Sequence, residues 1–113
     1  MEIKMFMKTV SYRLIEQNVD DKYFTLHEQK QLYADVFSAF TRLIATTWAS
    51  CPYLTGDDMV FCCLSKIGLE TSVICCCMGI VNRMSAKQRK HRIKNKMNEE
   101  KCNDLFDSIF NFI

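Results

Sequence analysis

The stretch "TSVICCCMGIVNRMSAKQRKHRIKNKM", residues 71–97, joins a short apolar segment to a strongly basic one through a tight turn. The apolar segment has helical spacing and is followed by Gly79, a common helix stop, which predicts a short helix over 71–78. Asn82 can cap a second helix over 83–97. This order of two helices around a turn is that of a helix-turn-helix, in which the second helix enters the DNA major groove.

The basic segment concentrates the charge of the chain. Positions 83–97 hold seven Lys and Arg residues and no Asp or Glu, whereas the whole chain has 15 Lys and Arg against 13 Asp and Glu. The remainder therefore carries a net charge of −5. A merely solvated helix would more often mix both signs, so this asymmetry favours one face directed at a polyanion.

A rotation of 100° per residue separates the buried and outward sides of this helix. Ala86, Ile93 and Met97 fall in a narrow arc that should face the core, and Arg89 lies close enough to it to have a structural role. The remaining polar side chains divide into two expected DNA-contacting sets. We expect base-edge contacts from Arg83, Lys87, Gln88 and His91, and phosphate contacts from Lys90, Arg92, Lys94 and Lys96.

The rest of the chain also predicts helices, because it contains only three Gly and one Pro and little strand-like alternation. Thr25 and Glu28 form a capping-box pattern, and Pro52 should stop the helix that follows. Thr55 can cap a third helix whose first turn holds Asp57 and Asp58, where the helix dipole favours anions. The expected fold is all-α with about six helices, over 3–17, 26–50, 55–68, 71–78, 83–97 and from Asn98 onward.

Residues 51–112 resemble the C-terminal LuxR-like helix-turn-helix DNA-binding domain of gut-bacterial transcriptional regulators, of the response-regulator effector type. The resemblance rests on "LTGDD" at 54–58, Gly68, the 71–78 segment and "KHRIKNKM" at 90–97, which matches the family ending Arg-x-Arg-Ile-x-x-Lys-Leu. It implies a bacterial DNA-binding regulator. Two features depart from the family pattern: a scaffold helix made apolar by Cys75–Cys77, and a turn one residue longer than usual.

The resemblance also suggests how the chain is organised. We expect residues 1–50 to form a helical hairpin or linker and residues 51–113 the helix-turn-helix region, in one compact unit overall. In regulators of this kind the N-terminal half joins the effector to a sensing region. The chain is therefore expected to be either a fragment of a longer regulator or a stand-alone effector.

Metal-binding and catalytic interpretations find little support. Neighbouring cysteines on a helix point about 100° apart, and no Cys-x-x-Cys pair occurs, so the seven cysteines are expected to be apolar thiols rather than zinc ligands. Cys76 is expected to point outward and to be the most reactive. "HEQKQ" at 27–31 lacks the second histidine of a zinc protease. We expect no enzyme, no cofactor and no metal.

The aromatic stripe of the last helix has two interpretations. Packing in the core is the simpler one, but LuxR-type effectors commonly pair through a terminal helix. Candidates for a homodimer contact are Phe106, Phe110, Phe112 and Ile113. The longest apolar run, Val73–Val81, is too short to cross a bilayer, so no membrane contact and a cytoplasmic setting are expected.

The sequence therefore predicts a sequence-specific DNA-binding transcriptional regulator that contacts double-stranded DNA through residues 82–97. The alternative is an all-helical interaction module whose basic helix docks an acidic protein. RNA binding is less favoured, since the aromatic residues lie in apolar stripes rather than among the cations.

Overall fold

The computed structural model describes residues 2–18, 22–99 and 102–110, with only the backbone described at Arg83 and Asn103. This part of the chain contains α-helices and no strand, so the all-α prediction is confirmed. The described residues form eight helices where about six were expected for the chain. They are α1 (Glu2–Met7), α2 (Val10–Gln17), α3 (Leu26–Ala39), α4 (Thr41–Ser50), α5 (Gly56–Ile67), α6 (Thr71–Met78), α7 (Arg83–Glu99) and α8 (Asn103–Phe110).

The single helix expected over 3–17 is instead two helices, α1 and α2. Thr9 separates them in an extended conformation, and its hydroxyl accepts a 3.2 Å hydrogen bond from the Tyr12 N–H. The same hydroxyl donates to the Phe6 carbonyl over 2.6 Å. The Thr9 hydroxyl therefore supplies a hydrogen-bond partner to a backbone carbonyl at the end of α1 and to a backbone N–H at the start of α2. Capping of this kind is a role that threonine favours.

The long helix expected over 26–50 also breaks, at Phe40. The break is stabilised from a distance, because the Glu2 carboxylate accepts hydrogen bonds from the backbone N–H groups of Arg42, at 2.7 Å, and Leu43, at 3.0 Å. Burial raises the pKa of Glu2, but these two hydrogen bonds, together with one from the Thr41 hydroxyl and the charge of Arg42, outweigh burial and lower the pKa below its ordinary value of 4.5. Glu2 thus supplies the first turn of α4 with the acceptor that Phe40 cannot provide.

Several local predictions are confirmed. The predicted capping box forms at Thr25 with Glu28, and the predicted Thr55 cap forms as well, completed into a capping box by Asp58. Gly68 ends α5 in the left-handed conformation, with φ of 98°. The start of the last helix was wrongly placed at Asn98, because α7 continues to Glu99 and α8 begins only at Asn103.

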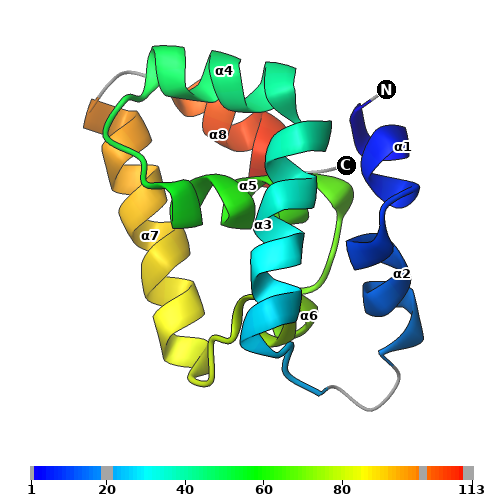
Figure 1. Cartoon of the computed structure of the whole chain (residues 1–113). Helices are drawn as coiled ribbons and strands as arrows, with labels where there is room; N and C mark the ends of the chain where they lie inside the picture. The colour runs from blue at the N-terminus through cyan, green and yellow to red at the C-terminus, as the bar shows by residue number, and fades with distance from the viewer. Residues whose placement is uncertain (1, 19–21, 100–101, 111–113) are drawn as a thin grey trace.

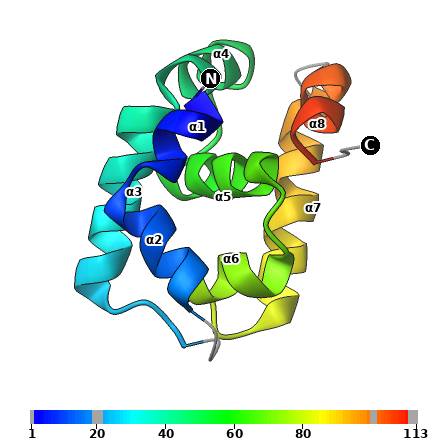
Figure 2. The same ribbon diagram turned by 90° about the vertical axis from the view of Figure 1, so that its right-hand side faces the viewer.

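The central helix of the molecule is α5, along which the side chains from Asp58 to Leu64 are all buried. It packs against α3, α4, α6 and α8, and Figures 1 and 2 show it running between α3 on one side and α7 on the other. One hydrophobic cluster includes Phe6, Leu32 and Val36 of the N-terminal half together with Ile93 and Ile109. The core is therefore shared by both halves of the chain.

Candidate nucleic-acid interface

The connection between α6 and α7 gives the two helices their relative position. Gly79 ends α6 with a φ of 70°, and the Ile80 N–H donates to the Cys75 carbonyl over 2.8 Å. The Asn82 side-chain oxygen then accepts a 2.9 Å hydrogen bond from the Met84 N–H at the start of α7. The predicted helix stop and helix cap are both confirmed. Val81, in the connection just before Asn82, is 79% exposed.

The apolar face of α6 is covered by the N-terminal half of the chain. The Phe24 N–H donates to the Cys76 carbonyl over 2.9 Å, and α3 packs against α6. The expectation that Cys76 points outward is wrong, since its side chain is only 6% exposed. The segment before α3 thus explains why Cys75–Cys77 replace the polar residues expected on an exposed scaffold helix.

Three residues of α7 face the core as the helical wheel predicted. Ala86, Ile93 and Met97 are fully buried and belong to the hydrophobic cluster. They lie along one line of the helix, so they fix which side of α7 turns away from the molecule. That outward side is the surface on which the candidate DNA contacts were placed.

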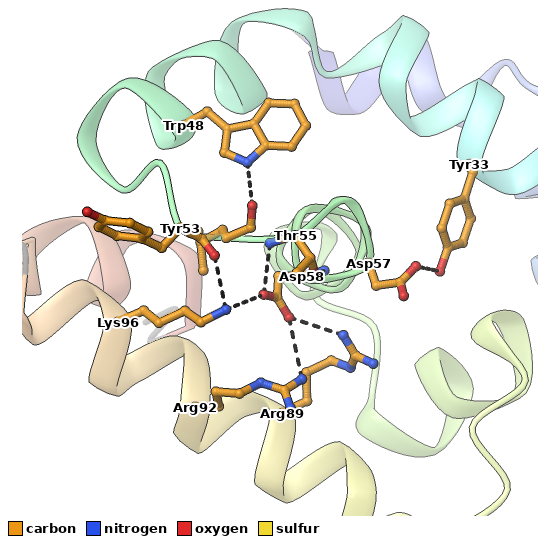
Figure 3. A network of polar contacts seen from close by, with 10 residues as sticks. Tyr33, Trp48, Tyr53, Thr55, Asp57, Asp58, Arg89, Arg92 and Lys96 are labelled. Carbon is orange, nitrogen blue, oxygen red and sulfur yellow. Dashed lines mark hydrogen bonds and ion pairs between the residues drawn. The ribbon is translucent and has the colours of Figure 1, made fainter.

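A buried carboxylate holds one flank of α7 (Figure 3). The Asp58 side chain is fully buried in α5, and its oxygens lie 3.1 Å from the Arg89 guanidinium, 3.3 Å from the Lys96 ammonium and 3.8 Å from the Arg92 guanidinium. Asp58 also accepts the backbone N–H of Thr55 over 3.0 Å. One side chain thus caps α5 and pairs with a row of cations on α7.

The same contacts keep Asp58 ionised. Burial raises its pKa, but hydrogen bonds from the Thr55 backbone N–H and the Lys96 ammonium outweigh burial and hold the pKa below its ordinary value of 3.8. A buried carboxylate is retained in a protein only with compensation of this kind. Lys96 gains a further acceptor in the Tyr53 carbonyl, 3.1 Å away.

Two of the residues predicted to contact phosphate therefore have a partner inside the protein. Lys96 is only 24% exposed and Arg92 is 55% exposed, and both face Asp58 rather than pointing clear of the molecule as expected. Arg89, which was expected to be structural, is confirmed in that role by its 3.1 Å contact. The spacing of 89, 92 and 96 places all three on one flank, and this spacing opposite an acidic first turn was a signal that sequence reasoning missed.

The other candidate residues lie on the outward side and on the opposite flank. Lys87, Gln88, Lys90, His91 and Lys94 are all exposed. Lys90 places its ammonium 5.3 Å from the centre of the Phe110 ring, and Lys94 lies 5.6 Å from that of Phe106. The flank that faces α8 is thus positioned by aromatic rings, whereas the flank that faces α5 is positioned by a carboxylate. The side chain of Arg83 lies outside the described residues.

The aromatic residues of α8 pack inside the molecule. Phe106 is 6% exposed, its ring centre lies 4.6 Å from that of Phe110, and Phe110 lies 6.2 Å from Phe61 of α5. The core interpretation is confirmed for Phe106. Phe112 and Ile113 lie outside the described residues, so a homodimer contact through this helix stays a prediction.

The cysteines form no site among the residues that the structure describes. All seven are thiols, six of them buried. Burial raises the pKa of Cys63 and of Cys77 to about 12. No group of three or more His, Cys, Asp or Glu side chains within residues 2–18, 22–99 and 102–110 is arranged to hold a metal ion. Glu28 of the "HEQKQ" segment serves its capping box.

Comparison with known proteins adds no functional information, so the function is inferred from the geometry of α6, α7 and α8. No protein-family profile, curated protein or solved structure matches this chain. Within the described ranges, no helix combines the length and the apolar character needed to cross a membrane.

Proposed function

We propose that this protein is a sequence-specific DNA-binding transcriptional regulator that inserts α7 into the major groove. In this proposal α6, the connection over 79–82 and α7 act as a helix-turn-helix, with α6 as the supporting helix. The left-handed conformation of Gly79 and the Asn82 cap support it, because they produce a short, defined turn between the two helices. The regulatory role comes from the resemblance of residues 51–112 to LuxR-like effector domains.

The observation that carries the proposal is the composition of the outward side of α7. Every charged side chain over residues 83–97 is basic, and Lys87, His91 and Lys94 are exposed on a helix whose opposite side is anchored in the core. Residues 83–97 can therefore approach the DNA backbone without an acidic side chain among them to oppose it, since Glu99 lies beyond them at the end of α7.

The Asp58 contacts refine the expected roles. Arg89 and Lys96 serve to hold α7 against α5, so Lys96 is removed from the main DNA-contacting set, of which Arg89 was not a member. In the refined proposal Lys90 and Lys94 contact phosphates. Base edges are contacted by Arg83, Lys87, Gln88 and His91, as the sequence suggested. A rigidly held helix keeps these donors in one register, which sequence-specific reading needs.

Binding to duplex DNA at several salt concentrations tests the proposal. Fluorescence anisotropy with a pool of random duplexes should give an affinity that falls steeply as salt rises. Selection of bound duplexes should enrich one motif, and Lys87→Ala should reduce the preference for that motif by about 1–3 kcal/mol. Absence of salt-dependent duplex binding would reject the proposal.

A second function is supported by exposed apolar side chains beside the basic surface. Val81 is 79% exposed and Met84 is 60% exposed, both next to the start of α7. An apolar edge beside a cationic helix also suits an acidic protein partner. Polyglutamate in the same anisotropy assay distinguishes the two functions: an interaction module should bind it at least as tightly as duplex DNA at equal salt.

A further inference from the structure

A recess of about 340 Å³ lies where α7 meets α8, on the flank opposite Asp58. Three ammonium groups and one imidazole from α7 line it, facing a phenyl ring and a carboxylate from α8. These side chains are Lys87, Lys90, His91, Lys94, Phe106 and Asp107. Three lysine ammonium groups against one carboxylate give the recess a net positive charge.

We propose that this recess is a phosphate-binding site, and that Asp107 within it limits the affinity for phosphate. The proposal rests on the proposed function, since a backbone phosphate of duplex DNA is the expected ligand. Because α8 forms a second wall beside α7, the proposed site is concave, whereas the surface of α7 alone would be convex. It also assigns a role to Asp107, an acidic residue in the lining of an otherwise basic recess.

The lysines are arranged to receive an anion before it arrives. Lys87, Lys90 and Lys94 are spaced by three and four residues, so they lie on one face of α7. The Phe110 and Phe106 rings attract the ammonium groups of Lys90 and Lys94, at 5.3 and 5.6 Å. Because a ring contact restricts these side chains, less conformational entropy is lost when a ligand binds.

The chemistry of the recess favours a phosphate group. Several lysine ammoniums at one point make a strong electrostatic site for an oxyanion with multiple acceptor oxygens. Asp107 opposes any anion that enters the recess, because like charges repel. Neutralising Asp107 should therefore strengthen binding, which a purely structural role on the surface of α8 would not produce.

The chain offers matched control variants. Asp104 is also exposed on α8 but does not line the recess. Asp107→Asn and Asp104→Asn change the net charge of the protein equally, so only a local effect can separate them. Lys8 is exposed in the connection between α1 and α2, and Figure 1 shows these two helices on the opposite side of the ribbon from α7. Lys8→Gln therefore controls for Lys90→Gln.

Two measurements on the full chain test the inference. In ¹H–¹⁵N spectra, inorganic phosphate should shift the amide signals of residues 87–94 and 106–107 more than chloride at equal ionic strength. In duplex binding at low salt, Asp107→Asn should tighten the dissociation constant roughly threefold and Asp104→Asn by less than about 1.5-fold. Lys90→Gln should weaken duplex binding about fivefold, with Lys8→Gln close to the parent.

The outcomes separate this inference from the proposed function. If duplex DNA binds but Asp107→Asn behaves as Asp104→Asn and phosphate shifts no recess signal, the recess is rejected and the proposed function stands. If phosphate shifts the recess signals and Asp107→Asn strengthens that titration while no duplex binds, the site takes a free phosphate and the proposed function is rejected. If polyglutamate displaces phosphate at equal charge concentration, the recess binds carboxylates and the phosphate assignment is overturned.

Discussion

The Arg89 guanidinium donates a 3.1 Å hydrogen bond to the Asp58 carboxylate, and this contact joins α7 to α5. Asp58 is fully buried and Arg89 is 21% exposed, so the pair is largely shielded from water. Because Asp58 also accepts the Thr55 N–H at the start of α5, one carboxylate fixes both the cap of the central helix and the rotation of α7 about its axis.

Asp58→Asn should destabilise the protein by about 2–4 kcal/mol, since it leaves Arg89 and Lys96 without their counter-charge. Urea unfolding followed by circular dichroism measures the change. Asp57→Asn is the matched control in the same turn, because Asp57 is exposed and accepts a 2.6 Å hydrogen bond from the Tyr33 hydroxyl. Its expected loss is about 1 kcal/mol or less. Equal losses in the free energy of unfolding for the two variants would show that the buried contacts of Asp58 stabilise the protein no more than the exposed contact of Asp57.

Stability should fall in acid through Asp58 and Glu2. The folded-state pKa of each carboxyl is lowered from its ordinary value, 3.8 for Asp58 and 4.5 for Glu2. A lowered pKa contributes stability that is fully present above the ordinary value and is lost as pH falls through the folded-state value. The melting temperature should therefore decline below about pH 4.5, and the decline should be shallower in Asp58→Asn. A parallel decline in parent and variant would contradict this assignment.

Lys94→Ala and Lys96→Ala should behave differently although the two residues lie two positions apart. Lys94 is exposed and is proposed to contact phosphate, so its removal should reduce the salt dependence of duplex binding by about 0.9 in slope with little loss of stability. Lys96 contacts Asp58 and the Tyr53 carbonyl, so its removal should lower the free energy of unfolding by about 1–2 kcal/mol. Reversed results would return Lys96 to the DNA-contacting set.

Gly79→Ala should destabilise the protein more than Gly68→Ala. Both glycines have positive φ, but a Cβ at Gly79 would lie 2.7 Å from the Gln29 side-chain nitrogen, whereas none of the surrounding atoms lies within 4 Å of a Cβ at Gly68. Moving Gln29 would break its 2.9 Å hydrogen bond to the Phe24 carbonyl. The expected loss is about 1 kcal/mol for Gly68→Ala and about 2 kcal/mol for Gly79→Ala, measured by urea unfolding. Gln29→Ala should remove most of the difference.

Cysteine labelling should follow burial. Cys102 is partly exposed, whereas Cys62, Cys63 and Cys77 are buried and burial raises the pKa of each thiol. Iodoacetamide at pH 8 should therefore modify Cys102 first, and the buried thiols should react only as the protein unfolds. Mass spectrometry of the digested chain identifies the order. Early modification of Cys76 would contradict its burial under the segment that contains Phe24.

The helix signals that proved reliable were local ones. The capping box at Thr25, the cap at Thr55 and the glycine stops at positions 68 and 79 each depend on residues within one turn, so they could be predicted from neighbouring residues. The breaks at Thr9 and Phe40 were missed because apolar periodicity continues through both. At Phe40 the stabilising group is Glu2, about forty residues away in the chain.

In the candidate interface, too, some features followed from the spacing of residues along α7 and others depended on contacts with other helices. Periodicity placed Ala86, Ile93 and Met97 in the core, and it placed Arg89 near them, because a helical wheel needs only the spacing of residues. It could not show that Arg92 and Lys96 face a buried carboxylate, since Asp58 lies on another helix. It also could not show that α8 forms one wall of a recess with Lys90 and Lys94.

By itself, then, the sequence determined the helical character of the chain, most helix caps and the buried line of α7, since these follow from backbone propensity and residue spacing. The tertiary structure alone decided which cations of α7 are held inside and which remain on the surface. The physical reason is that a charge is neutralised by its neighbours in space, and packing brings those neighbours from distant parts of the chain.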